Sequence, residues 1–152
     1  MSIEEKSIVI TSAVRTAIGS FCGSLKNMQA HELGAVVIKE SIKKSNLKFN
    51  DVDELIMGQV LTGAAGQNPA RQAAMQAGLP IEKTAYVINQ VCGSGLRSVA
   101  AGYQAIMSND LNIVISGGQE SMSNAPHAIN FRYGQKLKET NLIDTMIKDG
   151  LW

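Results

Sequence analysis

Short apolar runs rich in β-branched residues occur at four places along the chain and alternate with polar or glycine-containing stretches. An apolar run of this length without strict polar alternation is typical of a strand buried on both faces, as in a parallel sheet. The sequence therefore predicts four strands, at residues 8–14, 55–61, 84–88 and 113–115.

Three segments between these runs place apolar residues every three or four positions, the period of one face of an α-helix. The first extends from His31 to about Asn46. The second is short and alanine-rich, begins at Asn68 and Pro69 with an N-cap residue and a helix-starting proline, and ends at Gly78. The third has the clearest period, with apolar residues at Leu96, Val99, Ala100, Tyr103, Ile106 and Met107.

This alternation predicts an α/β fold, in which a mostly parallel sheet has right-handed crossovers and helices on both faces. The pattern changes near residue 120, because residues 121–135 are irregular and polar. A last helix is predicted after an Asn141 cap, on the apolar positions Leu142, Ile143, Met146 and Ile147. We therefore expect a core over residues 1–120 and a separate segment over residues 121–152.

The composition narrows the class of protein. The chain has 152 residues, 45% of them hydrophobic and 18% charged, which excludes a disordered or low-complexity protein. A net charge of +1 without a basic block argues against nucleic-acid and polybasic membrane binding. No apolar run is long enough to span a membrane, and Glu4 and Glu5 stand where a secretory signal has cations. We expect a cytoplasmic protein without nucleic-acid or membrane partners.

Cys22 and Cys92 are too few for a disulfide framework and lack the spacing of a zinc site, so we expect free thiols. Cys22 lies in a Gly/Ser-rich loop without a helix start, which predicts no role for it. The glycines at 63–66 lack the spacing of a phosphate-binding loop. With no metal, flavin, nicotinamide or nucleotide motif in the sequence, we expect no resident cofactor.

Cys92 lies where the third predicted strand meets the most regular predicted helix. Ligands of an open parallel sheet bind beyond the carboxyl ends of the strands, and a helix start favours a thiolate. Gly93 and Gly95 leave room for a substrate beside the sulfur. Two interpretations remain open from this pattern alone: Cys92 is a nucleophile, or it is a small buried core residue.

A nucleophilic thiol needs a base, and the two histidines are poor candidates. His31 falls in the first turn of the first predicted helix, remote from the strand ends, and suits a packing role. His127 falls in the irregular region and is relevant only if that region folds over the sheet. Neither histidine is an evident partner of Cys92.

Five blocks, in this order, resemble the thiolase family over essentially the whole chain. They are SAVRTAIGSF at 12–21, GQNPARQAAMQAGLP at 66–80, NQVCGSGLRS at 89–98, SGGQESMSNAPH at 116–127 and DTMIKDGLW at 144–152. The cysteine block is also compatible with other condensing enzymes of the superfamily, whereas GGQESMS and QNPARQ favour thiolases. Within the family the sequence is most similar to the biosynthetic, acetyl-CoA-condensing members.

The resemblance implies that Cys92 accepts an acetyl group from one acetyl-CoA. A second acetyl-CoA then attacks the acetyl-cysteine to give acetoacetyl-CoA and coenzyme A, and the reverse reaction is thiolysis. Coenzyme A is then a substrate carrier and not a bound prosthetic group. Leu151 matches a position that lies against the pantetheine of coenzyme A in this family, so it is a candidate substrate-binding residue.

The resemblance also implies an amino-terminal thiolase half, with a core half over 1–120 and the start of a loop domain over 121–152. Family members have a second half that supplies an Asn-Glu-Ala-Phe block, a Gly-His-Pro histidine and a Cys-x-Gly-Gly-Gly cysteine, and this sequence contains none of these blocks. The expected partner is a second copy of the chain or a complementing carboxyl-terminal half. Two hypotheses follow: an acetyltransferase that needs those groups, or a catalytically silent thiolase-fold module.

Overall fold

The computed structural model describes residues 7–137 and 139–152. Its main sheet has three parallel strands in the order β2-β1-β3, namely β1 (Glu54–Gly58), β2 (Thr84–Ile88) and β3 (Val114–Gly118). Glu54 pairs with both Thr84 and Val114, and Gly58 pairs with both Ile88 and Gly118. The three strands therefore end level with one another, and their carboxyl ends share one edge of the sheet.

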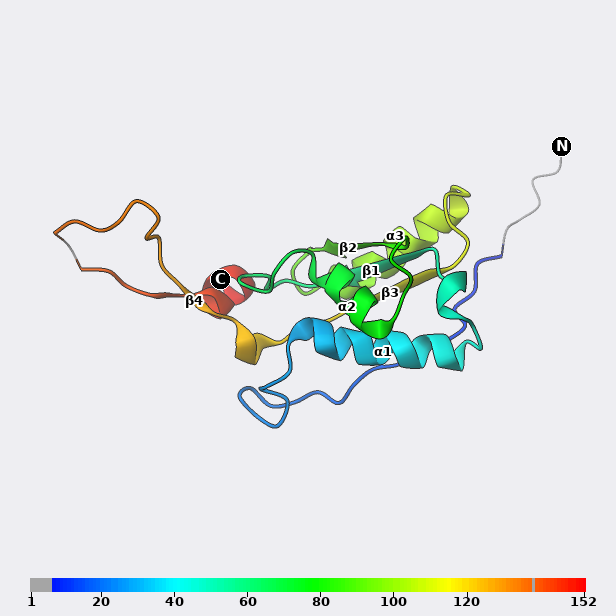
Figure 1. Ribbon diagram of the computed structural model, residues 1–152, viewed down its shortest axis with the longest axis horizontal. Coiled ribbons are helices and arrows are strands. Elements are labelled where there is room, and N and C mark those ends of the chain that lie inside the picture. Colours follow the sequence, from blue (N-terminus) through cyan, green and yellow to red (C-terminus); the bar gives the residue numbers. More distant parts are fainter. Residues whose placement is uncertain (1–6, 138) are drawn as a thin grey trace.

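Helices cover both faces of this sheet, which confirms the predicted α/β architecture. Figure 1 shows α1 (Ala30–Lys44) and α2 (Pro69–Ala77) on one side and α3 (Ser94–Met107) on the other. The small side chains of α2 let α1 approach closely, and both helices pack on β1. The core on this side consists of Ala35, Ile38, Ile42, Val52, Leu55, Met57, Ala70, Ala73, Ala74, Ala77 and Leu79.

Local capping explains where α2 begins and ends. The side-chain oxygen of Asn68 accepts a hydrogen bond from the N–H of Arg71 at 3.1 Å, and Pro69 occupies the first helical position. Gly78 ends the helix with a φ of 99°, in the left-handed region that favours glycine. Both boundaries confirm the prediction from sequence.

On the opposite face, the first turn of α3 lies directly against the backbone of β1. A Cβ at Gly58 would lie 2.5 Å from the carbonyl carbon of Ser94 and 2.6 Å from the backbone nitrogen of Gly95. No side chain fits in this space without a shift of the helix. Gly58 therefore lets α3 start at the end of the sheet, two residues after Cys92.

We expect Gly58→Ala to lower the free energy of unfolding by about 1–3 kcal/mol, because overpacking forces backbone shifts. Urea denaturation followed by circular dichroism measures this loss. Gly63→Ala is the matched control, since a Cβ there lies 3.5 Å from its nearest neighbour, Pro126. Equal losses in the two variants would contradict the packing role of Gly58.

Asp53 links the amino ends of β1 and β3. Its carboxylate accepts hydrogen bonds from the N–H groups of Ile113 at 3.0 Å and Asn112 at 2.8 Å. These bonds hold the pKa of Asp53 below its ordinary value of 3.8, and the bond from Ile113 has the larger effect. A lowered pKa means that the unfolded chain takes up this proton at a higher pH than the folded protein does.

The stabilisation by Asp53 is therefore present above pH 3.8 and is lost as the pH falls through the lowered pKa. We expect Asp53→Asn to reduce the unfolding free energy at neutral pH, with a difference from the parent that shrinks in acid. Unfolding titrations of both proteins from neutral pH to below 3.8 test this expectation. A difference that stays constant with pH would show that the charge contributes nothing.

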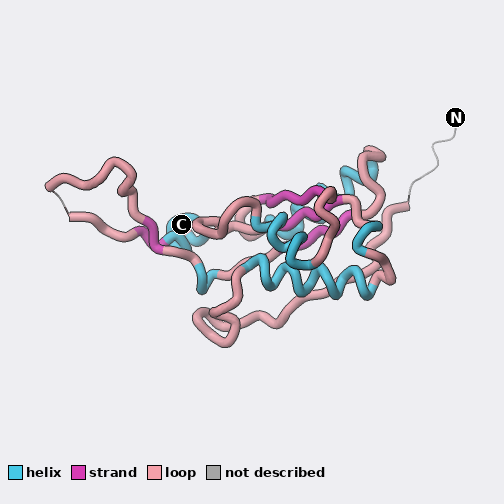
Figure 2. Tube along the Cα trace, viewed as in Figure 1, coloured by secondary structure: helices cyan, strands magenta, loops and turns pink. Residues whose placement is uncertain are grey.

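The first predicted strand is wrong. Residues 7–20 form neither helix nor strand, and Val9 and Ile10 are 70% and 80% exposed. This segment runs along α1 as a loop (Figure 2), with Thr11 Oγ1 2.9 Å from Ser45 Oγ and Ser12 Oγ 2.6 Å from Ser41 Oγ.

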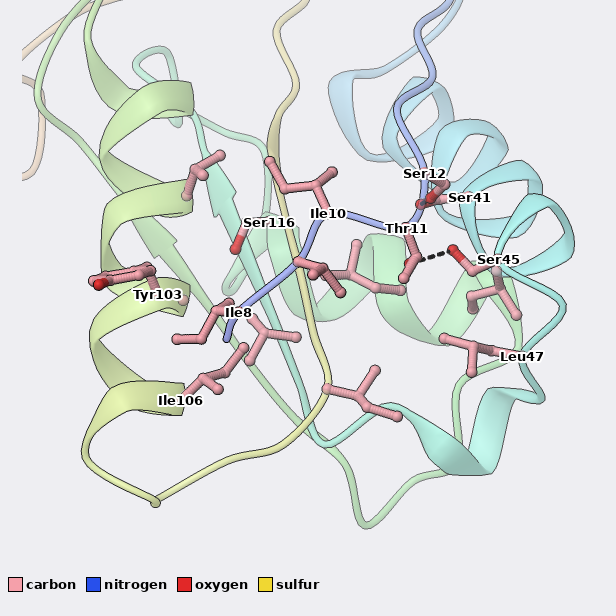
Figure 3. A pocket seen from close by; sticks show the side chains of 17 residues that line it. Ile8, Ile10, Thr11, Ser12, Ser41, Ser45, Leu47, Tyr103, Ile106 and Ser116 are labelled. Atoms are coloured by element: carbon pink, nitrogen blue, oxygen red, sulfur yellow. Dashed lines mark hydrogen bonds between the residues drawn. The ribbon is translucent and has the colours of Figure 1, made fainter. Parts of the chain in front are cut away.

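This segment lines a cavity of about 290 Å³. The cavity lies between residues 8–12 and β3, and its other walls come from α1 and α3 (Figure 3). The segment has the apolar character of a strand, but its hydroxyls at Thr11 and Ser12 contact the end of α1, and none of its described residues pairs with β3. The predicted four-stranded sheet is therefore a three-stranded sheet in the described chain.

The predicted start of the last helix is also wrong, because the helical turn begins at Met146 and not after Asn141. His127–Ala128 (β4) pairs antiparallel with Ile143–Asp144 (β5), and the helical turn η3 covers Met146–Leu151. Thr145, between β5 and η3, is buried, and its hydroxyl donates to the carbonyl of Pro126, just before β4, at 2.6 Å. The pairing of β5 with β4 is a long-range contact, so the local apolar period could not reveal it.

Between β4 and β5 the chain extends away from the sheet as an arm, at the left of Figure 1. In the described ranges, no helix combines the length and the apolar composition needed to cross a membrane.

Candidate active site

A cavity of about 430 Å³ lies at the carboxyl ends of the three parallel strands. This is the edge where open α/β sheets bind ligands. Its walls come from the chain after β1, the turn before α3, the end of β3 and the final helical turn. The lining residues are Gly58, Gln59, Val60, Leu61, Val91, Cys92, Ser94, Gly95, Gly118, Gln119, Glu120, Met122, Gly150 and Leu151.

Cys92 belongs to this cavity and precedes the first residue of α3, Ser94, by two positions. Its side chain is exposed and free of any disulfide, so the alternative of a buried core cysteine is wrong. Gly93 is the N-cap residue of α3, which places the thiol beside the helix start. The unpaired N–H groups of a helix start are therefore close to the sulfur.

The turn that carries Cys92 has a strained backbone. Val91 has a φ of 50°, which a β-branched residue adopts only when its surroundings hold it there. Its N–H donates to the side-chain oxygen of Asn89 at 2.9 Å. The hydroxyl of Ser94 accepts from the N–H of Gln90 at 2.8 Å and donates to the carbonyl of Val91 at 2.5 Å. Asn89 and Ser94 therefore hold the turn from both sides.

Glu120 is the carboxylate of the cavity wall. It accepts hydrogen bonds from the N–H of Val60 at 2.8 Å and from the N–H of Leu61 at 3.3 Å. Burial raises the pKa of Glu120 above its ordinary value of 4.5, and the N–H groups of Val60 and Leu61 offset part of this effect. Glu120 thus ties the end of β3 to the chain that leaves β1.

Two buried glutamines form the floor behind Glu120. The amide of Gln119 donates to the side-chain oxygen of Gln59 at 2.8 Å, and Gln59 donates to the carbonyl of Leu61 at 2.9 Å. In the described chain the buried Oε1 of Gln119 has no hydrogen-bond partner. This atom packs so close to Gly34 that a Cβ there would lie 1.9 Å from it. The pair joins the ends of β1 and β3 a second time.

The structure places the two predicted site residues, Cys92 and Leu151, in the same cavity. Leu151 is the last residue of η3 and is 64% exposed. Its proximity depends on the final helical turn, which folds back toward the strand ends. A Cβ at Gly150 would lie 3.2 Å from the Leu61 side chain, so that turn packs against the wall that Glu120 holds.

The other residues considered from sequence lie elsewhere. His31 is the second residue of α1, and His127 in β4 lies 3.8 Å from the Asp144 carboxylate. Cys22 is exposed, and its N–H donates to the hydroxyl of Ser123 at 2.9 Å. None of these three side chains lines the cavity, whose described lining contains one thiol and one carboxylate but no histidine. Nor do the described residues contain a cluster of His, Cys, Asp or Glu side chains that could hold a metal.

Sequence reasoning missed Gln59, Asn89 and Glu120 as parts of the site. A signal for them was present, because each is polar and follows the end of a strand by one or two residues. In a parallel sheet such positions converge on one edge. Ser94 was also missed, because a serine at a helix start has an ordinary capping explanation.

Comparisons with known proteins agree with this geometry. A family model described as the thiolase N-terminal domain matches residues 8–152. A protein of Paracoccus denitrificans named acetyl-CoA acetyltransferase is 57% identical over 144 residues, and one of the same name from Rhizobium meliloti (strain 1021) is 57% identical over 145 residues. A probable acetyl-CoA acetyltransferase of Escherichia coli (strain K12) is 49% identical over 148 residues.

These alignments cover 95% to 97% of this chain but only 37% to 38% of each relative. The chain thus spans well under half the length of the curated relatives that it matches. The family model covers nearly all of the described residues, including all three strands of the sheet and Cys92. The chain therefore belongs to the thiolase family and corresponds to its N-terminal domain.

Proposed function

We propose that this chain supplies the acyl-accepting half of an acetyl-CoA acetyltransferase site, with Cys92 as the nucleophile. The observation that carries the proposal is the exposed thiol of Cys92 beside the start of α3, in a cavity at the carboxyl ends of the strands. The names of the relatives supply the substrate class, acetyl-CoA.

In the first step the Cys92 thiolate attacks the carbonyl carbon of acetyl-CoA. A carbon–sulfur bond to Cys92 forms, the bond to the coenzyme A sulfur breaks, and coenzyme A leaves as a thiolate that takes up a proton. The backbone N–H of Cys92, at the helix start, is suited to stabilise the oxyanion that develops on the carbonyl oxygen. Gly93 and Gly95 leave the approach to the sulfur open.

In the second step a second acetyl-CoA loses a proton from its methyl carbon, and that carbon attacks the acetyl-cysteine. A carbon–carbon bond forms, the bond to Cys92 breaks, and acetoacetyl-CoA is released. Removal of the methyl proton needs a base. The described cavity lining offers no histidine and no second thiol, so we assign the completion of this step to groups outside the described chain.

The apolar part of the cavity suits the acyl and pantetheine portions of the substrate. Leu61, Met122 and Leu151 line it beside Cys92. Coenzyme A acts here as a substrate carrier, and no resident cofactor has a part in the proposed reaction. We assign Leu151 a contact with the pantetheine arm.

A catalytically silent thiolase-fold module is the second candidate function. It is favoured by the same absence of a base from the described lining of the cavity. In such a module Cys92 would be an ordinary exposed thiol, with no preference for acetyl-CoA over other acyl donors.

Incubation with acetyl-CoA, followed by alkylation and peptide mapping, separates these candidates. We expect acetylation at Cys92 in preference to Cys22, and we expect added coenzyme A to remove the acetyl group by the reverse reaction. Slow and equal labelling of the two thiols would support the silent module. The same mapping with a carboxyl-terminal thiolase half added tests whether a complementing chain supplies the second step.

Three further expectations accompany the proposal and stay predictions. They are the division at residue 120 into a core half and a loop domain, the association with a second copy or a complementing half, and the cytoplasmic location.

A further inference from the structure

The three strand ends at the cavity are joined by one path of hydrogen bonds that ends at Val91, the residue before Cys92. Glu120 follows β3, Val60 follows β1 and Asn89 follows β2. Each residue comes from a different strand, so the path crosses the full width of the sheet.

The path has three contacts. The Glu120 carboxylate accepts from the N–H of Val60 at 2.8 Å. The carbonyl of Val60 accepts from the side-chain amide of Asn89 at 3.4 Å, the longest of the three contacts. The side-chain oxygen of Asn89 accepts from the N–H of Val91 at 2.9 Å. Val91 is bonded covalently to Cys92, so the path links the backbone at the thiol to Glu120.

The backbone strain at Val91 makes the geometry of the Cys92 turn sensitive to the loss of these hydrogen bonds. A β-branched residue with a φ of 50° relaxes toward negative φ unless its neighbours prevent it. Asn89 holds the N–H of Val91, and Val60 fixes the orientation of the Asn89 side chain. Val60 is in turn held by Glu120, which also accepts from the N–H of Leu61 at 3.3 Å.

We propose that Glu120 is a positioning residue for Cys92, which acts through Val60 and Asn89 to hold the thiol at the start of α3. The inference rests on the proposed function of Cys92 as a nucleophile. In this role Glu120 acts as an acceptor of backbone N–H groups and not as a base toward substrate. Its loss lets Val91 relax and moves the sulfur away from the start of α3.

The test compares the parent chain with Glu120→Ala, Glu120→Gln and Asn89→Ala. Asp53→Asn is the matched control, because Asp53 is also a carboxylate that accepts two backbone N–H bonds, but at the opposite end of the sheet. The first readout is amide hydrogen exchange at Val91, which Glu120 does not contact. The second is the ratio of iodoacetamide alkylation rates at Cys92 and Cys22, measured by peptide mass in the same molecule.

We expect Glu120→Ala to speed exchange at Val91 by about tenfold and to lower the Cys92 to Cys22 ratio by about threefold or more. Asn89→Ala should do the same, and Glu120→Gln should retain most of the parental ratio because its amide oxygen still accepts. Asp53→Asn should leave both readouts at Cys92 and Val91 unchanged. If Glu120→Ala does not fold, Asn89→Ala and Glu120→Gln carry the same comparison.

Parental exchange at Val91 and a parental ratio in folded Glu120→Ala would overturn the inference. An equal rise of the ratio in Glu120→Ala and Glu120→Gln would also overturn it, because it would show a charge effect on the thiol and not a positioning effect. Neither readout uses coenzyme A. Failure of Cys92 to take an acetyl group would therefore reject the proposed function alone, and an unchanged ratio would reject the positioning role alone.

Discussion

Replacement of Cys92 by alanine is expected to reduce transfer of an acetyl group from acetyl-CoA to the protein by at least about a thousandfold. Among the described residues, Cys92 carries the one thiol that lies both beside a helix start and in the strand-end cavity. Loss of the sulfur removes the atom that forms the new thioester, so no rearrangement of the neighbours can compensate. Intact-mass spectrometry after incubation with acetyl-CoA measures the acetylated fraction.

Cys22→Ala is the matched control for this experiment. Cys22 is also an exposed free thiol, but it does not line the cavity. It lies in a turn, and its backbone N–H donates to the hydroxyl of Ser123. We expect this variant to keep parental acetylation. A variant without Cys92 that still gains an acetyl group on Cys22 at the parental rate would mean that acylation reports thiol exposure alone.

The exposed apolar face of α3 is expected to make the chain self-associate. Leu96 is 78% exposed and Tyr103 is 53% exposed, and Val99 and Met107 are also exposed on the same helix. Burial of each such side chain stabilises an associated state by about 1.5–3 kcal/mol, so contact between copies through this face is favoured. Sedimentation velocity over a range of concentrations should show a sedimentation coefficient that rises with concentration, and a stable, cooperative monomer would contradict this.

Leu96→Gln combined with Tyr103→Gln should weaken this association by about tenfold or more, because about 1.4 kcal/mol corresponds to a factor of ten. Ile81→Gln is the matched control. Ile81 is equally apolar and is 81% exposed, but it lies in the turn between α2 and β2 and away from α3. Weakening of similar size in Ile81→Gln would show that association is driven by general surface hydrophobicity and not by the α3 face.

Elements that depend on local signals were predictable from the sequence. The N-cap at Asn68, the proline after it and the left-handed Gly78 define α2 within a few residues, so no distant contact is needed. The apolar period of α3 and the short run of β2 are likewise local. The same local signals placed Cys92 at a junction of strand and helix, where the structure also has it.

Elements that depend on a distant partner were not predictable in this way. The segment at residues 8–14 has the apolar composition of a strand, but it contacts α1 through Thr11 and Ser12 and forms no ladder with β3. Ile143 has the spacing of a helical residue, but it belongs to β5 and pairs with Ala128 of β4. In both cases the pattern is local and the deciding contact is not.

By itself, the sequence determined the alternation of strands and helices, the family resemblance and the position of Cys92 beside a helix start, because these depend on residues close together in the chain. Only the tertiary structure decided which groups meet at the ends of the three strands. Glu120, Val60 and Asn89 follow three different strands, and only their common parallel register brings them level. A one-dimensional pattern carries no register between strands, so the path from Glu120 to Cys92 became visible only when the sheet was assembled.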